Sequence, residues 1–292
     1  MDLQLFTQIL ISSLLTGVAY GSVGLAFVTV YRVTSVINFP QADLGLVGEF
    51  VAISLSKISH VASLAGAIVA SAVASALLFL SILYPLRRAS LLVQTIALLG
   101  GGIALQSLLQ MVYGTGPQTL VPLTAGKPIL INGAAFPLQG FWVLDWGVIL
   151  VVGLHAFFER TLLGRAVRAC AIDRYAAGLV GIPIGLMAFV AFVLGGVISG
   201  VAITVQAPLS YLTVDSGLPF ALKGFIAAII GGGERVVACM FAGILLGALE
   251  GVVILWIPGA YQQILVLLAL LALLAVLMLR PGGLGRKMAH GI

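Results

Sequence analysis

The chain has 292 residues, of which 61% are hydrophobic and 8% are charged, and its formal net charge is +5. A soluble domain carries about a quarter charged residues, so this composition excludes a water-soluble globular protein. The Lys and Arg residues form no long run, which also excludes a basic segment of the kind that binds nucleic acid. The mean hydropathy of +1.22 instead predicts a polytopic membrane protein.

Apolar segments long enough to cross a membrane follow one another along the chain. The first lies between Asp2 and Arg32 and contains 29 uncharged residues, whereas about 20 apolar residues suffice to cross the hydrocarbon core. We therefore expect an all-α fold, a single transmembrane domain over residues 1–292 that forms a bundle of eight or nine spans. The second and seventh segments are short and are expected to be broken or re-entrant. The predicted spans lie near 4–30, 41–57, 61–84, 91–113, 139–158, 184–206, 218–231, 236–256 and 261–279.

Positive charges are distributed unequally between the two sets of loops that alternate along the chain. One set carries 11 Lys and Arg residues, the opposite set carries Lys57 and Lys127, and Lys223 falls within a span. Positive residues stay on the cytoplasmic side, so we expect the N-terminus outside and the C-terminus in the cytoplasm. Cys170 and Cys239 then lie on or near the reducing side, where no disulfide is expected. The larger set comprises Arg32, Arg87, Arg88, Arg160, Arg165, Arg168, Arg174, Arg235, Arg280, Arg286 and Lys287.

Small residues recur every four positions in two predicted spans, the first and the eighth. Small side chains on one helix face let two helix backbones approach closely in lipid, where no hydrophobic force joins helices. We therefore interpret both stripes as helix-packing faces. They consist of Ser13, Gly17 and Gly21, and of Gly243, Gly247 and Gly251.

Polar residues near the start of the second span are candidates for a translocation pathway, because an ionisable group in hydrocarbon costs roughly 3 kcal/mol. Pro40 can open this helix, and Asn38 and Asp43 either line a pathway or cap the helix. Glu49 lies nine residues beyond Pro40, about 13 Å along a helix. It belongs either to a pathway or subunit interface, or to an internal hydrogen-bonded site.

Lys223 and Glu250 fall at similar depth in the seventh and eighth spans, roughly 8 Å from the outer boundary by helical rise. Because an isolated charge there is costly, we expect them to approach each other or to share a polar cavity, and both are candidate pathway residues. The alternative is that Lys223 extends outward to the membrane surface while Glu250 meets a partner subunit.

The longest segment on the predicted inner side, 159–183, is rich in Ala and Leu with Arg spaced along it, so we expect a helix that ends near Gly181 and Pro183. A helix held between two spans either docks into a groove on a cytoplasmic partner or touches only lipid headgroups. Its predicted small-residue face consists of Leu162, Ala166, Ala169, Cys170, Asp173 and Ala177.

No catalytic or metal-binding motif occurs in the sequence. It contains no phosphate-binding G-x-x-x-x-G-K-[ST], no H-E-x-x-H and no G-x-S-x-G, and its histidines, His60, His155 and His290, are scattered. We therefore expect no enzyme, no metal and no cofactor in this chain. Uphill transport would need either an ion gradient or a separate ATPase.

Four segments, in chain order, resemble motifs of branched-chain amino acid ABC transporter permeases, and together they span nearly the whole chain. Segment 164–182 is similar to the family's coupling loop, R-A-x-A-x-D-x-x-A-A-x-L-x-G-I, and 37–43 to its I-N-F-A-x-G-[ED]. Pro40, Ala42 and Glu49 depart from the family's usual residues. The chain is most similar to the liv-H-type subunit, since it starts directly with its first span. The other two segments are 224–232 and 280–284.

The resemblance implies the permease subunit of an ATP-driven importer in the bacterial inner membrane, working by alternating access. A second permease, related or identical, would complete the channel, and an extracytoplasmic binding protein would deliver a branched-chain or other hydrophobic amino acid. Other amino acids, urea and small amides stay open as solutes. Two cytoplasmic ATPase subunits would bind the ATP and push on 159–183. The implied coupling residues there are Arg165, Arg168, Asp173, Ala177 and Gly181.

An ion-gradient-driven secondary transporter of a small solute is the alternative. It would need an ion site within the membrane, for which Glu49 and Glu250 are the deep carboxylates, and it would need no helix that docks a partner. An intramembrane enzyme would need clustered catalytic groups or metal ligands, which the scattered histidines disfavour.

Overall fold

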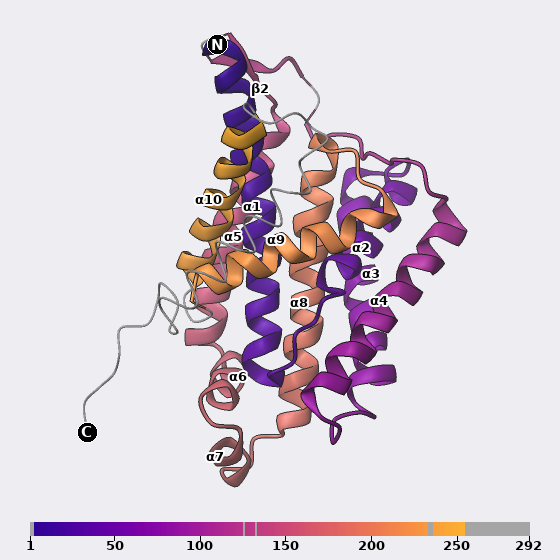
Figure 1. Ribbon diagram of the computed structural model, residues 1–292, viewed down its shortest axis with the longest axis vertical. Coiled ribbons are helices and arrows are strands. Elements are labelled where there is room, and N and C mark those ends of the chain that lie inside the picture. Colours follow the sequence, from indigo (N-terminus) through magenta and orange to yellow (C-terminus); the bar gives the residue numbers. More distant parts are fainter. Residues whose placement is uncertain (1–2, 125, 132, 233–235, 255–292) are drawn as a thin grey trace, which may run out of the picture.

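The computed structural model describes residues 3–124, 126–131, 133–232 and 236–254 (Figure 1). Helices make up nearly all the regular structure in these ranges. The elements are α1 (Leu3–Thr34), α2 (Gln41–Leu55), α3 (His60–Leu78), the π-helical turn η1 (Phe79–Leu83), α4 (Leu91–Tyr113), β1 (Ile129–Ile131), β2 (Ala134–Phe136), α5 (Gln139–Arg160), α6 (Leu162–Ile172), α7 (Arg174–Leu179), α8 (Ile184–Gln206), the 3-10 turns η2 (Ala207–Leu209) and η3 (Val214–Ser216), α9 (Gly217–Ile230) and α10 (Val236–Ile254).

Six of the described helices are long and apolar enough to cross a membrane: α1, α3 with η1, α4, α5, α8 with η2, and α10. The chain is therefore a multi-pass helical membrane protein. Helices α2 and α9 contain 15 and 14 residues, which gives each a length of only about 22 Å against a hydrocarbon core of about 30 Å. The ninth predicted span, 261–279, lies outside the described residues.

Helix α1 forms the centre of the bundle, and α8, α9 and α10 pack against it (Figure 1). Every residue of α1 from 17 to 30 is buried. The buried hydroxyls of Ser22 and Thr29 each donate a 2.8 Å hydrogen bond to a carbonyl oxygen one turn earlier, those of Val18 and Leu25. These polar groups therefore enter the apolar core with their hydrogen bonds made inside their own helix.

The two stripes of small residues lie against each other, between α1 and α10. A side chain at Gly247 would collide with the backbone of Ser13 and Gly17, and one at Gly243 would collide with the backbone of Gly21. At the end of the stripe, Gly251 faces the side chain of Ser13. The backbones of the two helices are consequently in direct contact, as glycine stripes permit in lipid.

Helices α2, α3 and α8 pack through small residues as well. Gly196 and Gly200 of α8 face Ser75 and Ser71 of α3. The Ser75 hydroxyl donates a 2.7 Å hydrogen bond across the interface to the carbonyl oxygen of Phe192. Small side chains and an interhelical hydrogen bond thus stabilise this contact together.

Helix α9 runs across the bundle rather than along it, and it passes in front of α1 and α8 in Figure 1. It contacts α2, α1 and α10. The crossing with α1 is close, because a side chain at Gly224 would collide with Val23 and with the backbone of Gly24. Helix α9 therefore links the region where α2 begins to the region of α10.

The segment between α4 and α5 contains two short antiparallel strands within the otherwise helical fold. Strands β1 and β2 pair Ile129 with Phe136, and Gly133 in their turn has a φ of +83°, which glycine adopts without strain. The Gln8 side chain of α1 accepts a hydrogen bond from the Ala135 amide and donates one to the Ala135 carbonyl. It thus extends the hairpin and fixes it to α1, which local hydropathy does not reveal.

Helix α4 stands at the edge of the bundle (Figure 1) and is the least buried of the six long helices. Many of its large apolar side chains are exposed, among them Leu92, Ile96, Leu108 and Met111. A soluble protein could not leave such a flank uncovered, whereas a membrane protein exposes it to acyl chains or to another chain.

Candidate functional site

Lys223 of α9 and Glu250 of α10 form an ion pair, with Nζ 2.5 Å from Oε1. The Lys223 ammonium group also donates a 2.8 Å hydrogen bond to the Tyr20 hydroxyl of α1 and lies 4.8 Å from the centre of the Tyr20 ring. The side chains of Lys223 and Glu250 are 17% and 24% exposed. The structure thus brings together the two charges that were expected to meet, rather than directing them outward.

Lys223, Glu250 and Tyr20 form a triad that connects α9, α10 and α1 through one ammonium group. Each charge compensates the other at a depth where either alone would be costly, and Tyr20 supplies a further acceptor. Sequence reasoning missed Tyr20. The available signal was a tyrosine inside a span, because a buried tyrosine hydroxyl usually has a hydrogen-bond partner.

A second cluster of polar side chains lies at the start of α2, next to Pro40. Pro40 is the N-cap of α2, and no side chain forms a capping hydrogen bond at the N-terminus of this helix. Asn38 Nδ2 instead donates a 2.8 Å hydrogen bond to Gln41 Oε1, and Gln41 Nε2 donates a 3.0 Å bond to Ser199 Oγ of α8. All three side chains are buried. The capping interpretation of Asn38 is therefore wrong, and Gln41 and Ser199 are polar residues that the sequence analysis missed.

Asp43 lies in the first turn of α2, where α2, α4 and α9 meet. A side chain at Gly217, the first residue of α9, would collide with its carboxyl group, and a Cβ at Gly102 of α4 would lie 3.1 Å from Oδ2. Asp43 cannot form the reciprocal bond of a capping box, because the N-cap, Pro40, has no N–H. The carboxyl group thus occupies a junction that two glycines leave open, and the capping interpretation of Asp43 finds no hydrogen bond to support it.

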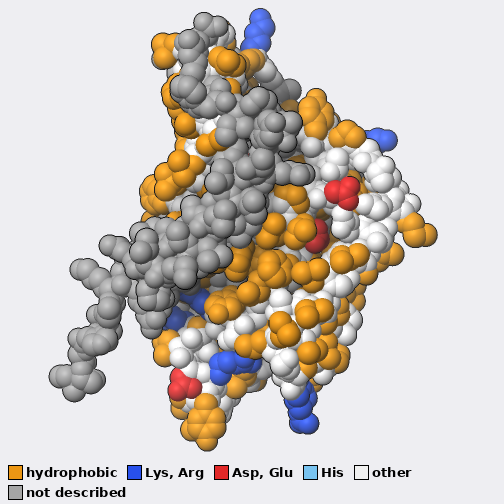
Figure 2. Space-filling view, viewed as in Figure 1, with side chains coloured by type: hydrophobic (Ala, Val, Ile, Leu, Met, Phe, Trp, Pro, Cys, Tyr) orange, Lys and Arg blue, Asp and Glu red, His pale blue; other side chains and the backbone are white. Residues whose placement is uncertain are grey.

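A neighbouring carboxylate belongs to the same region. Asp215 of η3 accepts hydrogen bonds from Gln106 Nε2 at 2.5 Å and from Gln110 Nε2 at 3.1 Å, both from α4. Gly102, Gln106 and Gln110 follow one another at four-residue spacing, so they share one face of α4, and this spacing was the signal available in the sequence. Figure 2 shows acidic side chains on the face where α9 begins. The start of α9 is therefore framed by polar groups from α2 and α4.

Glu49 is completely buried within α2, and neither carboxylate oxygen has a hydrogen-bond partner among the described residues. The interpretation as an internally hydrogen-bonded glutamate is therefore wrong for this part of the chain. A buried polar group without a partner is costly, and such exceptions tend to mark functional positions. The position of Glu49 inside the bundle also removes it from direct contact with a second subunit.

Segment 159–183 folds into two helices, α6 and α7, rather than one. Asp173 separates them, because its backbone is extended (φ −149°) and its carboxylate caps α7 by accepting hydrogen bonds from the amides of Tyr175 and Ala176. The prediction of one continuous helix with Asp173 on its face is therefore wrong. Asp173 is a good N-cap, and here the cap overrides the helix propensity of the alanines around it.

The implied coupling residues have different environments in this segment. Arg165 is exposed, and Arg168 lies 3.7 Å from Glu159 on the surface. Ala177 is buried against the bundle, and Gly181, with a φ of +86°, ends α7. The junction of α6 and α7 and the end of α7 form a tip, here called the α6–α7 tip. Sequence reasoning missed its exposed apolar residues, which are Ile172, Tyr175, Leu179 and Val180.

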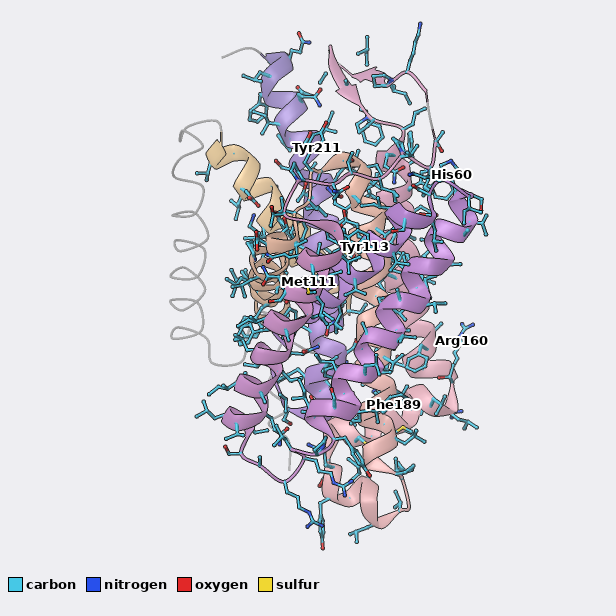
Figure 3. The ribbon with its side chains drawn as sticks, turned by 90° about the vertical axis from the view of Figure 1, so that its right-hand side faces the viewer. His60, Met111, Tyr113, Arg160, Phe189 and Tyr211 are labelled. Atoms are coloured by element: carbon cyan, nitrogen blue, oxygen red, sulfur yellow. The ribbon has the colours of Figure 1, made fainter. Side chains whose placement is uncertain are left out.

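No group of three potential metal ligands occurs within the described ranges. His155 lies 3.7 Å from Glu159, four residues later on the exposed surface of α5. His60 lies at the start of α3 (Figure 3), and His290 falls outside the described residues.

Comparison with known proteins identifies the family. A family described as "Branched-chain amino acid transport system / permease component" matches residues 9–274. The chain belongs to this family. It is 27% identical to the high-affinity branched-chain amino acid transport system permease protein BraD of Pseudomonas aeruginosa and 25% identical to LivH of Escherichia coli K12, each over 96% of both chains. The solved structure of PsaBC from Streptococcus pneumoniae in complex with Fab is similar in fold alone, with a TM-score of 0.51 at 16% identity, covering 96% of this chain and 94% of that one.

The family match includes all five candidate pathway residues and the whole of α6 and α7. It also includes three of the four segments that resemble family motifs, while 280–284 lies beyond it. The relatives are transport permease components and not enzymes. The structural features described above therefore belong to a transport protein of the branched-chain amino acid permease family.

Proposed function

We propose that this chain is the membrane-spanning permease subunit of an ATP-driven importer for branched-chain or other hydrophobic amino acids. A second permease completes the translocation pathway, an extracytoplasmic binding protein delivers the solute, and two ATPase subunits bind and hydrolyse ATP. The chain itself binds no cofactor. Its N-terminus lies outside and its C-terminus in the cytoplasm of a bacterial cell, with α6 and α7 on the cytoplasmic side.

The observation that carries this proposal is the shape and chemistry of the α6–α7 tip. Two short helices project from the end of the bundle (Figure 1) and expose large apolar side chains, among them Ile172 and Tyr175. At the base, Arg174 Nη1 donates a 3.2 Å hydrogen bond to the Thr34 carbonyl at the end of α1. An apolar tip with a firm attachment to the central helix can transmit a push from a groove on a cytoplasmic partner.

The polar groups of α2, α9 and α10 supply the candidate pathway. Helices α2 and α9 are too short to span the hydrocarbon by themselves, and short or broken helices commonly line transport pathways. We propose that they act as re-entrant or broken elements. Asp43 lies against Gly217 at the start of α9, and Lys223 within α9 pairs with Glu250 of α10, so movement of α9 would change both contacts together.

Co-purification tests the coupling role. Tyr175→Ala/Leu179→Ala removes two exposed apolar side chains from the tip without altering the Asp173 cap, and we expect at least a tenfold loss of co-purifying ATPase, in line with the removal of two buried contacts. Val148→Ala/Val152→Ala, which changes exposed apolar residues of α5, is the matched control. Full retention of the ATPase by the tip variant would contradict the coupling role.

Transport by reconstituted protein separates the two energy sources. The importer requires ATP, the ATPase subunits and the binding protein, and it transports in the absence of an ion gradient. Solute uptake by the purified chain alone, driven by a proton or sodium gradient and abolished by Glu49→Gln or Glu250→Gln, would instead establish the secondary transporter. A panel of branched-chain and other amino acids, urea and small amides, scored by solute-stimulated ATP hydrolysis, identifies the solute.

A further inference from the structure

A cavity of about 480 Å³ opens at the α6–α7 end of the bundle, between η1, α4, α7 and α8. Its floor is apolar and buried, formed by Phe79, Leu83 and Ala188. Figure 3 views this side of the molecule, where Phe189 of α8 lies next to the lower part of α3, and its ring is 5.5 Å from that of Phe79. The π-helical turn η1 supplies two floor residues, and such turns are frequent at functional sites.

The rim of this cavity is strongly basic. Arg87 and Arg88, from the turn after η1, and Arg174, from the start of α7, line it, and no acidic residue does. The Arg87 guanidinium stacks on the Tyr84 ring at 4.5 Å, and Arg174 is held by its hydrogen bond to Thr34. None of the three arginines takes part in an ion pair among the described residues. Three guanidinium groups from two segments therefore line one cavity, and none has a carboxylate partner among the described residues.

Exposed apolar side chains lie on the helices that border the cavity. Leu77 and Leu80 of the α3–η1 helix, and Leu91 and Leu92 of α4, are each more than half exposed. Leu91 itself lines the cavity, and Leu80 belongs to the same π-helical turn as the floor residues Phe79 and Leu83. Figure 2 shows basic side chains gathered at this lower end of the molecule. A ligand that fits both parts needs an anionic head and an apolar body.

We propose that this cavity binds the phosphate-bearing headgroup of an anionic phospholipid, with the acyl chains lying along α3 and α4. Guanidinium groups bind phosphate oxygens in a bidentate manner, and basic cavities between membrane helices bind such headgroups. The lipid would join the turn after η1 to Arg174 of α7, and so connect the edge of the bundle to the α6–α7 tip. This inference depends only on the membrane location of the chain.

The test measures lipid binding to the full chain by native mass spectrometry in detergent, with phosphatidylglycerol and phosphatidylethanolamine of identical acyl chains. We expect preferential binding of phosphatidylglycerol, and in Arg87→Gln/Arg88→Gln a loss of affinity of about 30-fold, because each basic residue near an anionic headgroup contributes about a factor of five. Arg87→Lys/Arg88→Lys keeps the charge but not the bidentate geometry, and should recover part of the affinity lost in the glutamine variant. Arg160→Gln/Arg165→Gln removes two exposed arginines outside the cavity and is the matched control.

Inorganic phosphate and glycerol 3-phosphate, added at millimolar concentration, distinguish a lipid site from a site for a free anion. The lipid proposal expects no displacement of phosphatidylglycerol by either. Displacement by free phosphate, equal affinity for both lipids, or equal losses in the cavity and control variants would overturn it. The recovery with lysine shows that a loss in the glutamine variant reflects charge and not misfolding.

Discussion

Glu250 and Tyr20 both contact the ammonium group of Lys223. Removal of one partner from a mostly buried ion pair leaves an uncompensated charge, whereas removal of both leaves an apolar contact. A variant that lacks one partner should therefore be less stable than a variant that lacks both, although it has lost fewer atoms.

We expect Lys223→Met or Glu250→Met alone to lower the free energy of unfolding by about 3 kcal/mol, and the double variant to lie within about 1 kcal/mol of the unaltered protein. Thermal unfolding of the detergent-purified chain gives the comparison. Additive losses in the double variant would mean that the two charges do not interact. The matched variant Tyr20→Phe removes only the hydroxyl and should cost about 1 kcal/mol.

At the scale of elements, the contact between α1 and α10 depends on the absence of side chains. Gly247→Ala places a methyl group against the backbone of Ser13 and Gly17, and we expect a loss of about 1–3 kcal/mol from overpacking. Gly153→Ala and Gly100→Ala are matched controls, since nothing lies within 4 Å of a Cβ at either position. These controls should be neutral or slightly stabilising, because alanine favours a helix over glycine. A Gly247→Ala variant as stable as the controls would exclude the close contact.

Cys170 lies close to Asp173, the residue that separates α6 from α7. This thiol is buried, and its burial raises the pKa, with the Arg174 charge opposing the shift only in part, so less of the reactive thiolate exists near neutral pH. We expect maleimide to label Cys170 at least about tenfold more slowly in the folded protein than after denaturation. Asp173→Ala removes the cap of α7 and should speed the labelling, while Asp145→Ala, at an exposed site on α5, should not.

Hydropathy predicts the long helices well, because a run of apolar residues bounded by charges or by Gly and Pro has few alternatives in lipid. The depth of Lys223 and Glu250 also pointed to their contact. The break at Asp173 and the hairpin at 129–136 were missed, since each is set by a local hydrogen bond pattern rather than by hydropathy. Gln41, Ser199 and Tyr20 were missed because their importance comes from partners 158 to 203 residues away in the chain.

At the scale of the whole molecule, the unequal distribution of Lys and Arg predicts its orientation. In spheroplasts, a membrane-impermeant maleimide should label Lys57→Cys and not Arg88→Cys, because the two exposed positions lie at opposite ends of the bundle. The native thiols interfere little, since Cys170 and Cys239 are buried. Permeabilised membranes should give labelling at both positions. The reverse pattern would place the α6–α7 tip outside and would also end the importer proposal.

The length of α1 has a mechanical consequence. With 32 residues, it extends about 48 Å, against a hydrocarbon thickness of about 30 Å. An isolated helix could reduce this mismatch by tilting, but α1 packs against α8, α9 and α10, which restrict its tilt. Its surplus turns must therefore protrude beyond the hydrocarbon, and the hairpin bound to Gln8 packs against this protruding end.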